Sequence, residues 1–520
     1  MKEKYGVGEQ SFEALISEGC VYVDKTPYIE KLLDQGKYFF LARPRRFGKS
    51  LFLSTLKCYF EGKQKLFEGL YIYPLTRWSE ISSPVLHLDL NPESYSHDSS
   101  LPQILDKYFS HWENIYDIPR ASGNFSIRFS NIIEGAWRKS GKKVVILVDE
   151  YDKPLVNNLS CEKRFSLFRD LLSAVYSSFK GNGDYIRLVM LTGVSRLGKL
   201  NVFSGLNNLR DISFHHDFNS ICGLTEKELM SCFPLGLKSL QNTLDIGPEE
   251  LASLLKLHYD GYRFSVNGEF LYNPFSILSL MVNREFRDYW VESGQATLLV
   301  EQLKRYGSSL ENIFPARCSL SELPVLDLEN PNPVPLLYQT GYLTIKDFDS
   351  QSRLVTLDLP NYEVKNGFFL FLLPFYANLH GLSPALVIHN FVEDVKTGHI
   401  ESFIRRLEDL FASVPYDMAI EKEQNIHNAL LIFITLIGLE VKAEFKTSRG
   451  RIDLLLETPL YLYIIELKLD GTAEEALRQI EARQYDLQFK NSGKEIIKVG
   501  ISFSSHKRNI DDYKFTVSKN

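Results

Sequence analysis

Short apolar runs alternate with helical patterns through the first part of the chain. Residues Tyr38–Ala42 (YFFLA), Val144–Val148 (VVILV) and Ile186–Leu191 (IRLVML) form apolar runs of strand length, and Val85–Leu90 (VLHLDL) alternates apolar and polar positions. A continuous apolar run is typical of a parallel strand that helices cover on both faces. Strands separated by helical segments, such as the one at Leu51–Glu61, predict a layered α/β domain, which we place at residues 1–225.

The pattern becomes mainly helical near Thr225. In the stretch TEKELM, Thr225 stands three residues before Glu228, which is the spacing of a capping box at a helix start. A further helix is expected at Pro248–Tyr259. We therefore predict a helical lid domain at residues 226–380, in which Pro335–Ile345 (PLLYQTGYLTI) has the helix-turn-strand pattern of a winged-helix-like part.

The C-terminal part shows a third pattern, which we assign to residues 381–520 as linker helices followed by a compact αβββαβ unit. Its expected elements are a helix at Glu421–Ile437, strands near Val441–Phe445, Arg451–Glu457 and Leu462–Leu467, a helix at Ala473–Tyr485 and a last strand at Lys498–Phe503. The fold class expected for the whole chain is therefore α/β, with a helical domain between two α/β domains.

Composition agrees with a protein of several globular domains. The chain has 520 residues, with 44% hydrophobic and 24% charged residues and a formal net charge of −6. This charge argues against a strongly basic nucleic-acid binder but allows a local basic face. The longest apolar run, Gly367–Phe375, is too short to span a bilayer, and the N-terminus lacks a signal-peptide pattern. With six scattered cysteines and no CxxC pair, we expect a cytoplasmic protein without a membrane segment.

The strand at Tyr38–Ala42 leads into the sequence RPRRFGKS at Arg43–Ser50, and a helix follows. A strand, a loop ending in Gly-Lys-Ser and a helix together form the context of a phosphate-binding loop. Lys49 would reach the β and γ phosphates of ATP, the Ser50 hydroxyl would ligate Mg²⁺, and Gly48 lets the backbone approach the phosphates. Arg43 stands where such loops usually have glycine, and Arg45 would add charge to the phosphate grip. A basic turn before a helix is the alternative interpretation.

Polar residues follow two further predicted strands. Asp149 and Glu150 come directly after VVILV, at the strand end where ligands bind in open α/β sheets. Asp149 can hold Mg²⁺ and Glu150 can orient or deprotonate the attacking water. Thr192 and Ser195 follow IRLVML and are candidate sensors of the γ phosphate. Arg196 or Arg210 could stabilise charge in the transition state. A capped strand end and a structural turn are the alternatives.

A second group of chemically active residues lies near the C-terminus. Glu466 and Lys468 are two residues apart on one predicted strand and so share a face, and Asp453 lies on the preceding strand. Two carboxylates that hold Mg²⁺ beside a lysine suit phosphodiester hydrolysis. A solvated strand face with a weak ion pair is the alternative. Neighbouring helices add further polar candidates, namely Gln479 and Tyr485 on the following helix and Glu421 or Glu423 on the preceding one.

The chain resembles bacterial AAA-ATPase-like proteins that carry a C-terminal PD-(D/E)XK nuclease-superfamily domain. The motifs that carry the resemblance are Tyr22–Thr26 (YVDKT), Arg43–Ser50 (RPRRFGKS), Val148–Pro154 (VDEYDKP), Thr192–Ser195 (TGVS), Tyr259–Phe264 (YDGYRF), Tyr272–Ser276 (YNPFS), Tyr338–Leu343 (YQTGYL), Thr447–Asp453 (TSRGRID), Glu466–Gly471 (ELKLDG) and Ala473–Leu477 (AEEAL). The resemblance implies a P-loop ATPase domain, a helical lid and a restriction-endonuclease-like domain. Ile452 replaces the proline of the PD signature, while Asp453, Glu466 and Lys468 are all present.

Our main hypothesis is an ATP-hydrolysing protein coupled to a Mg²⁺-dependent domain that binds or cleaves nucleic acid. Basic residues near Asp453 would contact phosphates; they are Lys442, Lys446, Arg449 and Arg451. A second hypothesis is an ATP-dependent switch or scaffold whose nuclease-like domain only binds nucleic acid or a protein partner, and a third treats both sites as relics. The sequence does not decide whether the substrate is DNA or RNA. It also leaves the oligomeric state open; in a homo-oligomer, a neighbouring copy can supply an arginine to the ATP site.

Overall fold

The computed structural model divides the chain into two compact units. Unit 1 comprises residues 1–290 and 316–361, and unit 2 comprises residues 291–315 and 362–520. Within them, the structure describes residues 3–91, 94–121, 124–159, 161–196, 208–291, 299, 303, 310–324, 332–377, 379, 381–412, 422–440, 442–448, 451–483, 493–507 and 509–518, with backbone only at 422–427, 439–440, 442–448 and 451–453. The three-domain division at residues 225 and 380 stays a prediction.

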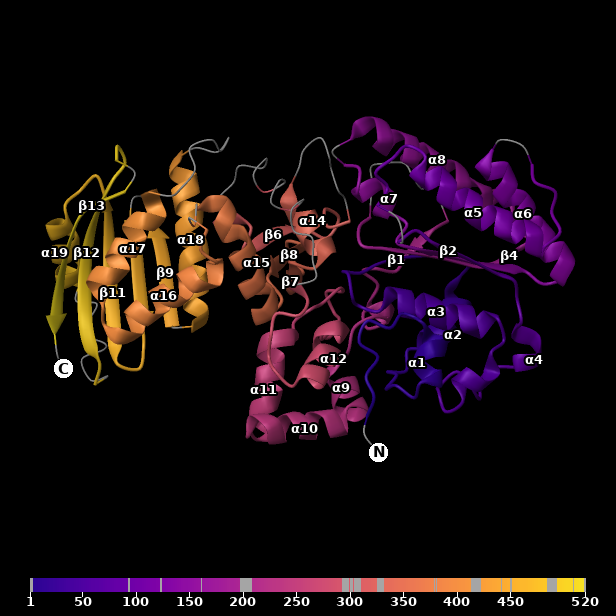
Figure 1. Cartoon of the computed structure of the whole chain (residues 1–520), viewed down its shortest axis with the longest axis horizontal. Helices are drawn as coiled ribbons and strands as arrows, with labels where there is room; N and C mark the ends of the chain where they lie inside the picture. Colours follow the sequence, from indigo (N-terminus) through magenta and orange to yellow (C-terminus); the bar gives the residue numbers. More distant parts are fainter. Residues whose placement is uncertain are drawn as a thin grey trace. The chain divides into compact units, whose positions relative to one another are not determined.

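A five-stranded sheet in the order β2-β3-β4-β1-β5 forms the centre of unit 1 (Figure 1). Its strands are β1 (Tyr38–Ala42), β2 (Val85–Asp89), β3 (Val144–Asp149), β4 (Ile186–Gly193) and β5 (Arg210–Asp211). Every neighbouring pair is parallel. The strands predicted from the apolar runs are confirmed, and β3 is buried along its whole length, as a strand covered on both faces requires.

Helices cover both faces of this sheet. Helix α3 (Lys49–Phe60) packs against β2, β3 and β4, while α6 (Phe125–Ser140) contacts β3 and packs against α8 (Glu162–Gly181) on the other face (Figure 1). Helix α5 (Ser100–Ile115) packs against α6. The remaining short helices of this region are α1 (Phe12–Ser17), α2 (Pro27–Gln35), α4 (Trp78–Ile81) and α7 (Lys153–Val156). The layered α/β domain is thus confirmed.

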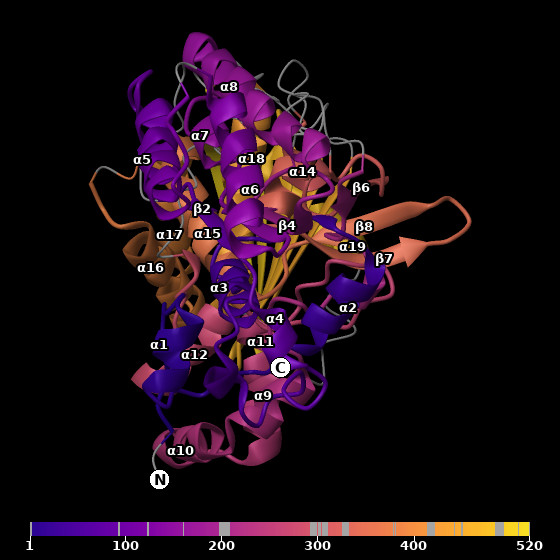
Figure 2. The ribbon, with the colours of Figure 1, turned by 90° about the vertical axis from the view of Figure 1, so that its right-hand side faces the viewer.

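The rest of unit 1 joins a helical cluster to a small sheet. Helix α9 (Glu226–Cys232) begins with the predicted capping box, in which Thr225 and Glu228 cap each other's backbone N–H groups. The other helices are α10 (Pro234–Leu244), α11 (Pro248–Tyr259), α12 (Pro274–Asn283) and α14 (Pro333–Thr340). An antiparallel sheet in the order β6-β8-β7 follows, made of β6 (Ala316–Ser319), β7 (Thr344–Asp349) and β8 (Leu354–Asp358), and its β7–β8 hairpin projects outward in Figure 2.

Unit 2 contains a second five-stranded sheet, in the order β13-β12-β11-β10-β9. Its strands are β9 (Lys442–Ser448), β10 (Arg451–Glu457), β11 (Tyr461–Leu469), β12 (Glu495–Ser504) and β13 (Asn509–Ser518). The expected strands are present, but the prediction that Lys498–Phe503 is the last strand was wrong, because β13 follows and pairs antiparallel with β12. The unit is therefore αβββαββ.

The two faces of strand β11 pack against different helices. Leu462 and Ile464 belong to a core cluster with Leu477 and Ile480 of α19 (Ala473–Arg483). The intervening Tyr463 donates a hydrogen bond to the Val395 carbonyl at 2.8 Å. That carbonyl lies on α16 (Pro384–Thr397), and the other helices of unit 2 are α15 (Tyr362–Tyr376), α17 (Ile400–Ala412) and α18 (Lys422–Glu440). Alternation along β11 therefore points its even-numbered side chains toward α19.

No helix in the described part of the chain is both long and apolar enough to cross a membrane. The apolar run Gly367–Phe375 lies inside α15, where Phe368, Phe369, Leu372 and Leu373 are buried. All six cysteines are unpaired; Cys58, Cys222 and Cys318 are buried, and Cys20, Cys161 and Cys232 are half-buried.

Gly500 of β12 lies against the backbone of α19. A Cβ atom at this position would lie 2.3 Å from the Ala473 carbonyl oxygen and 2.8 Å from the Leu477 nitrogen. Both are backbone atoms of the helix, so the helix itself would have to move. We predict that Gly500→Ala lowers the opening free energy of β12 by about 2 kcal/mol, a common cost of overpacking.

Amide hydrogen exchange measures this change directly. Peptides from β11, β12 and α19 should exchange faster, while those from β1 and β3 in unit 1 should not change and serve as an internal control. Gly181→Ala at the end of α8 is a control substitution, because its Cβ meets no atom within 4 Å. Unchanged exchange in β12 would contradict the prediction.

Candidate functional site

The predicted phosphate-binding loop connects β1 directly to α3. Gly48 takes a left-handed conformation, with φ of 99°, and is the N-cap of α3. Only glycine adopts this conformation without strain. No side chain caps the first turn of α3, and a Cβ at Gly48 would meet no atom within 4 Å. The start of α3 thus has no described side-chain cap, and free N–H groups at a helix start suit an anion.

Arg43, which replaces the usual first glycine, points inward. Its side chain is 1% exposed and donates hydrogen bonds to the carbonyls of Ser213 at 2.7 Å and Phe218 at 2.9 Å. The guanidinium also lies 4.2 Å from the centre of the Phe264 ring. Burial lowers the pKa of Arg43, yet a guanidinium stays protonated in proteins. Arg43 is therefore a structural anchor that ties the start of the loop to the segments around residues 213–219 and 264.

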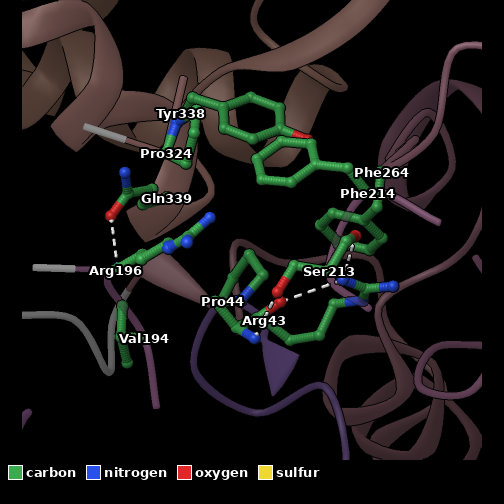
Figure 3. A pocket seen from close by; sticks show the side chains of 11 residues that line it. Arg43, Pro44, Val194, Arg196, Ser213, Phe214, Phe264, Pro324, Tyr338 and Gln339 are labelled. Carbon is green, nitrogen blue, oxygen red and sulfur yellow. Dashed lines mark hydrogen bonds between the residues drawn. The ribbon is translucent and has the colours of Figure 1, made fainter. Parts of the chain in front are cut away.

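The loop is also held by residues that follow it far along the chain. Trp290 donates an indole hydrogen bond to the Arg45 carbonyl at 3.1 Å. Gly341, in the left-handed region, packs on Pro44 so closely that a Cβ there would lie 2.7 Å from the Pro44 Cβ. Arg43 and Pro44 line a cavity of about 20 Å³ together with Gln339 and other residues (Figure 3), which has room for about one water molecule.

The Lys49 ammonium is buried in the loop. It donates to the carbonyls of Arg43 at 3.0 Å and Pro44 at 3.2 Å and lies 3.4 Å from Glu150 Oε1. The Lys49 side chain is only 3% exposed and that of Glu150 is 17% exposed. The structure thus brings the loop lysine and the acidic end of β3 together, as expected.

Asp149, the preceding acid, is positioned by β4. Its Oδ1 accepts a hydrogen bond of 2.6 Å from the Thr192 hydroxyl, and both residues are buried. In the parallel register, Asp89 at the end of β2 lies directly beside Asp149. Burial raises the pKa of Asp89, and the charges of Asp149 and Glu150 add to this effect. Asp89 was not among the predicted site residues, although an acid at the end of VLHLD was the available signal.

Asp152 is a further buried acid. It lies in the motif VDEYDKP, and no role was predicted for it. Its carboxylate is 1% exposed and accepts hydrogen bonds from the Ser195 N–H at 2.7 Å and the Ser195 hydroxyl at 2.6 Å. Burial raises the pKa of Asp152 to about 6, with the Glu150 charge acting in the same direction and the Ser195 hydrogen bonds and the Lys49 charge opposing it. Ser195 is therefore held by Asp152.

The candidate arginines differ in exposure and in their partners. Arg45 and Arg46 are exposed, and the Arg46 guanidinium lies 3.8 Å from the centre of the Phe275 ring. Arg196 forms an ion pair with Asp211 at 2.8 Å. Arg210 donates to the Gln35 carbonyl at 3.3 Å. Arg196 and Arg210 are thus held by contacts within unit 1.

In unit 2, the antiparallel register places Asp453 of β10 directly opposite Glu466 of β11. Glu466 is 1% exposed, and its Oε1 lies 3.4 Å from the Lys468 ammonium. Gln479 of α19 donates to Glu466 and accepts from Lys468. Glu466, Lys468 and Gln479 therefore converge between β11 and α19.

Other candidates lie outside the described residues. Arg449, Tyr485 and Glu421 fall in this group. For Asp453, Lys442, Lys446, Arg451 and Glu423 the structure describes the backbone but not the side chain.

The donor sets in both units fit the groups expected to bind there. The open start of α3 and the Lys49 ammonium suit phosphate oxygens. The buried Asp149 carboxylate offers hard oxygen ligands of the kind that Mg²⁺ prefers. The buried Glu466 carboxylate offers the same kind of ligand in unit 2.

Comparisons with known proteins agree with this arrangement. Residues 6–203 match the model of the AAA-ATPase-like family, described as predicted AAA-ATPase. Residues 421–513 match that of the PD-(D/E)XK nuclease superfamily. The chain is also 33% identical over 533 residues to a protein of Azotobacter chroococcum mcd 1, described as an uncharacterized protein in vnfD 5'region, and the match covers 98% of each chain.

The phosphate loop and its acids lie within the first matched region, and Asp453, Glu466, Lys468 and Gln479 lie within the second. The chain therefore belongs to the family of AAA-ATPase-like proteins that carry a C-terminal domain of the PD-(D/E)XK nuclease superfamily.

Proposed function

We propose that the protein binds and hydrolyses ATP with Mg²⁺ in unit 1, and that this reaction drives or gates a Mg²⁺-dependent nuclease site in unit 2. The observation that carries the proposal is the convergence of the loop lysine and the strand-end acids. The Lys49 ammonium lies 3.4 Å from Glu150, and Asp149 is fixed by Thr192 at the end of the neighbouring strand. A basic turn without a ligand gives no reason for this convergence at the carboxyl ends of parallel strands.

Each residue of the ATP site has a role that its position supports. Bound ATP with Mg²⁺ would supply the phosphoryl group and a divalent charge. Lys49 would turn from the loop carbonyls to the phosphates, and Ser50 and Asp149 would hold the cation. Glu150 would orient and deprotonate the attacking water. Thr192 keeps Asp149 in position and would sense the γ phosphate, while Arg45 and Gly48 would border the phosphates.

The unit 2 site supports phosphodiester hydrolysis. Asp453 and Glu466 would hold Mg²⁺ at their shared register position, and Lys468 would stabilise charge on the reacting phosphate. Gln479 would orient both Glu466 and Lys468, because its NH₂ group donates to Glu466 and its oxygen accepts from Lys468. The proposed substrate class is nucleic acid. In unit 1, the helical part and the β6-β8-β7 sheet would form the lid, with its winged-helix-like part.

One observation favours a second function, an ATP-dependent switch whose C-terminal domain binds without cutting. Glu466 is 1% exposed, and its Oε1 is shared by Lys468 and Gln479. A carboxylate that already has these partners gains less free energy from binding a cation. Under this function, ATP turnover persists and cleavage of every nucleic acid is absent.

Lys49→Ala should raise the Kd for ATP by about 10- to 100-fold, because it removes a charge-assisted contact to phosphate. Calorimetric titration with ATP and Mg²⁺ measures this change. Lys57→Ala is the matched control, since Lys57 lies on the same helix and its side chain is 41% exposed. Equal affinity in wild type and Lys49→Ala would remove the phosphate-loop assignment.

Glu150→Gln should leave ATP affinity nearly unchanged and lower kcat by about 100-fold or more, which is the scale of general base catalysis. Steady-state phosphate release measures kcat. Turnover at the wild-type rate would exclude Glu150 as the base.

Glu466→Gln and Asp453→Asn should each reduce Mg²⁺-dependent cleavage of nucleic acid to background, because each removes a charged ligand from the metal site. Cleavage is measured on single- and double-stranded DNA and RNA. Glu474→Gln is the matched control on α19, where the Glu474 side chain is 46% exposed. Glu466→Gln and Asp453→Asn should both keep the wild-type rate of ATP turnover. A wild-type protein that hydrolyses ATP but cuts none of these substrates would support the switch instead.

A further inference from the structure

Hydrogen bonds cross-link the loop after β3 to the turn after β4. The Tyr151 N–H donates to the Thr192 carbonyl at 3.0 Å, and the Tyr151 hydroxyl donates to the Ser195 carbonyl at 2.9 Å. The Asp152 carboxylate accepts from the Ser195 N–H and hydroxyl, and its oxygens lie 3.2 and 3.3 Å from the Val194 nitrogen. Both chain segments leave the sheet at its carboxyl edge, where the proposed ATP site lies.

The groups bound by Asp152 are all hydrogen-bond donors. The Val194 N–H, the Ser195 N–H and the Ser195 hydroxyl face its two oxygens. A carboxylate satisfies such a set because it only accepts, whereas an amide would turn an NH₂ group toward one of the donors. A carboxylate therefore satisfies all three donors, with both Ser195 groups bonded to Oδ2 and the Val194 N–H shared between the two oxygens.

Gly193 lets the two segments approach this closely. A Cβ atom at Gly193 would lie 2.5 Å from Asp152 Oδ1 and 2.7 Å from Tyr151 Cδ1. Both neighbours are buried at 1% exposure or less, so they have little room to move away. The glycine and the acid thus form one close contact between the segments.

This contact bears on the proposed chemistry through Thr192. Thr192 directly precedes Gly193 and donates to Asp149 at 2.6 Å, while Glu150 lies two residues before Asp152. A displacement of the turn would move the Thr192 hydroxyl away from Asp149. A displacement of the loop would move Glu150 relative to Lys49. Asp152 opposes both movements without touching the phosphate loop in any contact the structure describes.

We propose that Asp152 is a positioning residue of the ATPase reaction, whose carboxylate fixes Thr192, Asp149 and Glu150 relative to one another by holding the turn at Gly193–Ser195. The inference rests on the proposed ATPase function. It assigns to Asp152 an effect on the rate of hydrolysis and not on the binding of ATP, because the Lys49 charge acts on Asp152 but no described hydrogen bond or ion pair joins Asp152 to Lys49 or to the start of α3. A misplacement of about 1 Å can cost roughly 100-fold in rate.

The test compares Asp152→Asn, Ser195→Ala and the control Asp170→Asn. The Asn side chain has nearly the shape of Asp but lacks the second acceptor. Ser195→Ala removes one donor and keeps the backbone donors. Asp170 pairs with Arg169 on the surface of α8 and is 69% exposed, so its loss should have little effect.

Steady-state kinetics separate positioning from binding. We expect Asp152→Asn to lower kcat by roughly 10- to 100-fold and to leave the KM for ATP within about twofold. Ser195→Ala should lower kcat by about threefold to tenfold, the scale of one hydrogen bond. Asp170→Asn should match the wild type.

Amide exchange in the nucleotide-free protein gives a readout that does not depend on activity. In Asp152→Asn, the amides of Val194 and Ser195 should exchange at least about tenfold faster, whereas those of β1 and β3 should keep the wild-type rate. Loss of protection across the whole sheet would assign Asp152 a purely structural role and overturn the proposal. Ser195→Ala then provides the same comparison in a milder variant, with a smaller increase in exchange expected at the amides of Val194 and of residue 195.

The outcomes also separate this inference from the proposed function. If the wild type turns over ATP and Asp152→Asn keeps the same kcat, the positioning role is wrong and the ATPase stands. If the wild type neither binds nor hydrolyses ATP, the proposed function fails and the positioning role fails with it. A loss of ATP affinity equal to the loss of kcat would also overturn the inference.

Discussion

The buried charge of Arg43 is the interaction on which the arrangement around the phosphate loop depends. Its guanidinium binds backbone carbonyls after β5 and lies against Phe264, so the loop, the end of the sheet and the helical part share one anchor. None of its described hydrogen-bond or ion-pair partners is a carboxylate. The positive charge therefore stays uncompensated by a described salt bridge and adds to the positive field at Lys49 and the start of α3.

Strands β1 to β4 of the central sheet could be predicted because they are apolar or alternating runs separated by helical patterns, whereas the polar two-residue strand β5 (Arg210–Asp211) carries no such signal. The acids at Asp149 and Glu150 follow one of these runs. The inward orientation of Arg43 could not, since a charged residue in a basic stretch is usually solvated. The role of Asp152 depends on the close approach of Gly193, a residue of another strand. Such contacts arise from tertiary structure and leave no periodic signal.

In the C-terminal sheet, too, pairing between neighbouring strands could be predicted from the sequence, whereas contacts between distant elements could not. Register between β10 and β11 follows from a short connection, so the pairing of Asp453 with Glu466 was within reach of the sequence. Gly500 allows α19 to lie close to the sheet, and Gln479 of this helix donates a hydrogen bond to Glu466. Strand β13 was missed although Tyr513, Phe515 and Val517 alternate with polar residues, a pattern that indicates a half-exposed strand.

The order in which the chain builds unit 1 has a consequence for its synthesis. Unit 1 is completed by residues 316–361, which the ribosome adds only after residues 291–315 of unit 2. Gln339, which accepts a hydrogen bond from the Arg196 N–H, and Gly341, which packs on Pro44, both lie on this returning segment. A nascent chain that ends at residue 290 therefore lacks part of the support for the phosphate loop. If the loop binds nucleotide as proposed, its native geometry is complete only after the returning segment has left the ribosome.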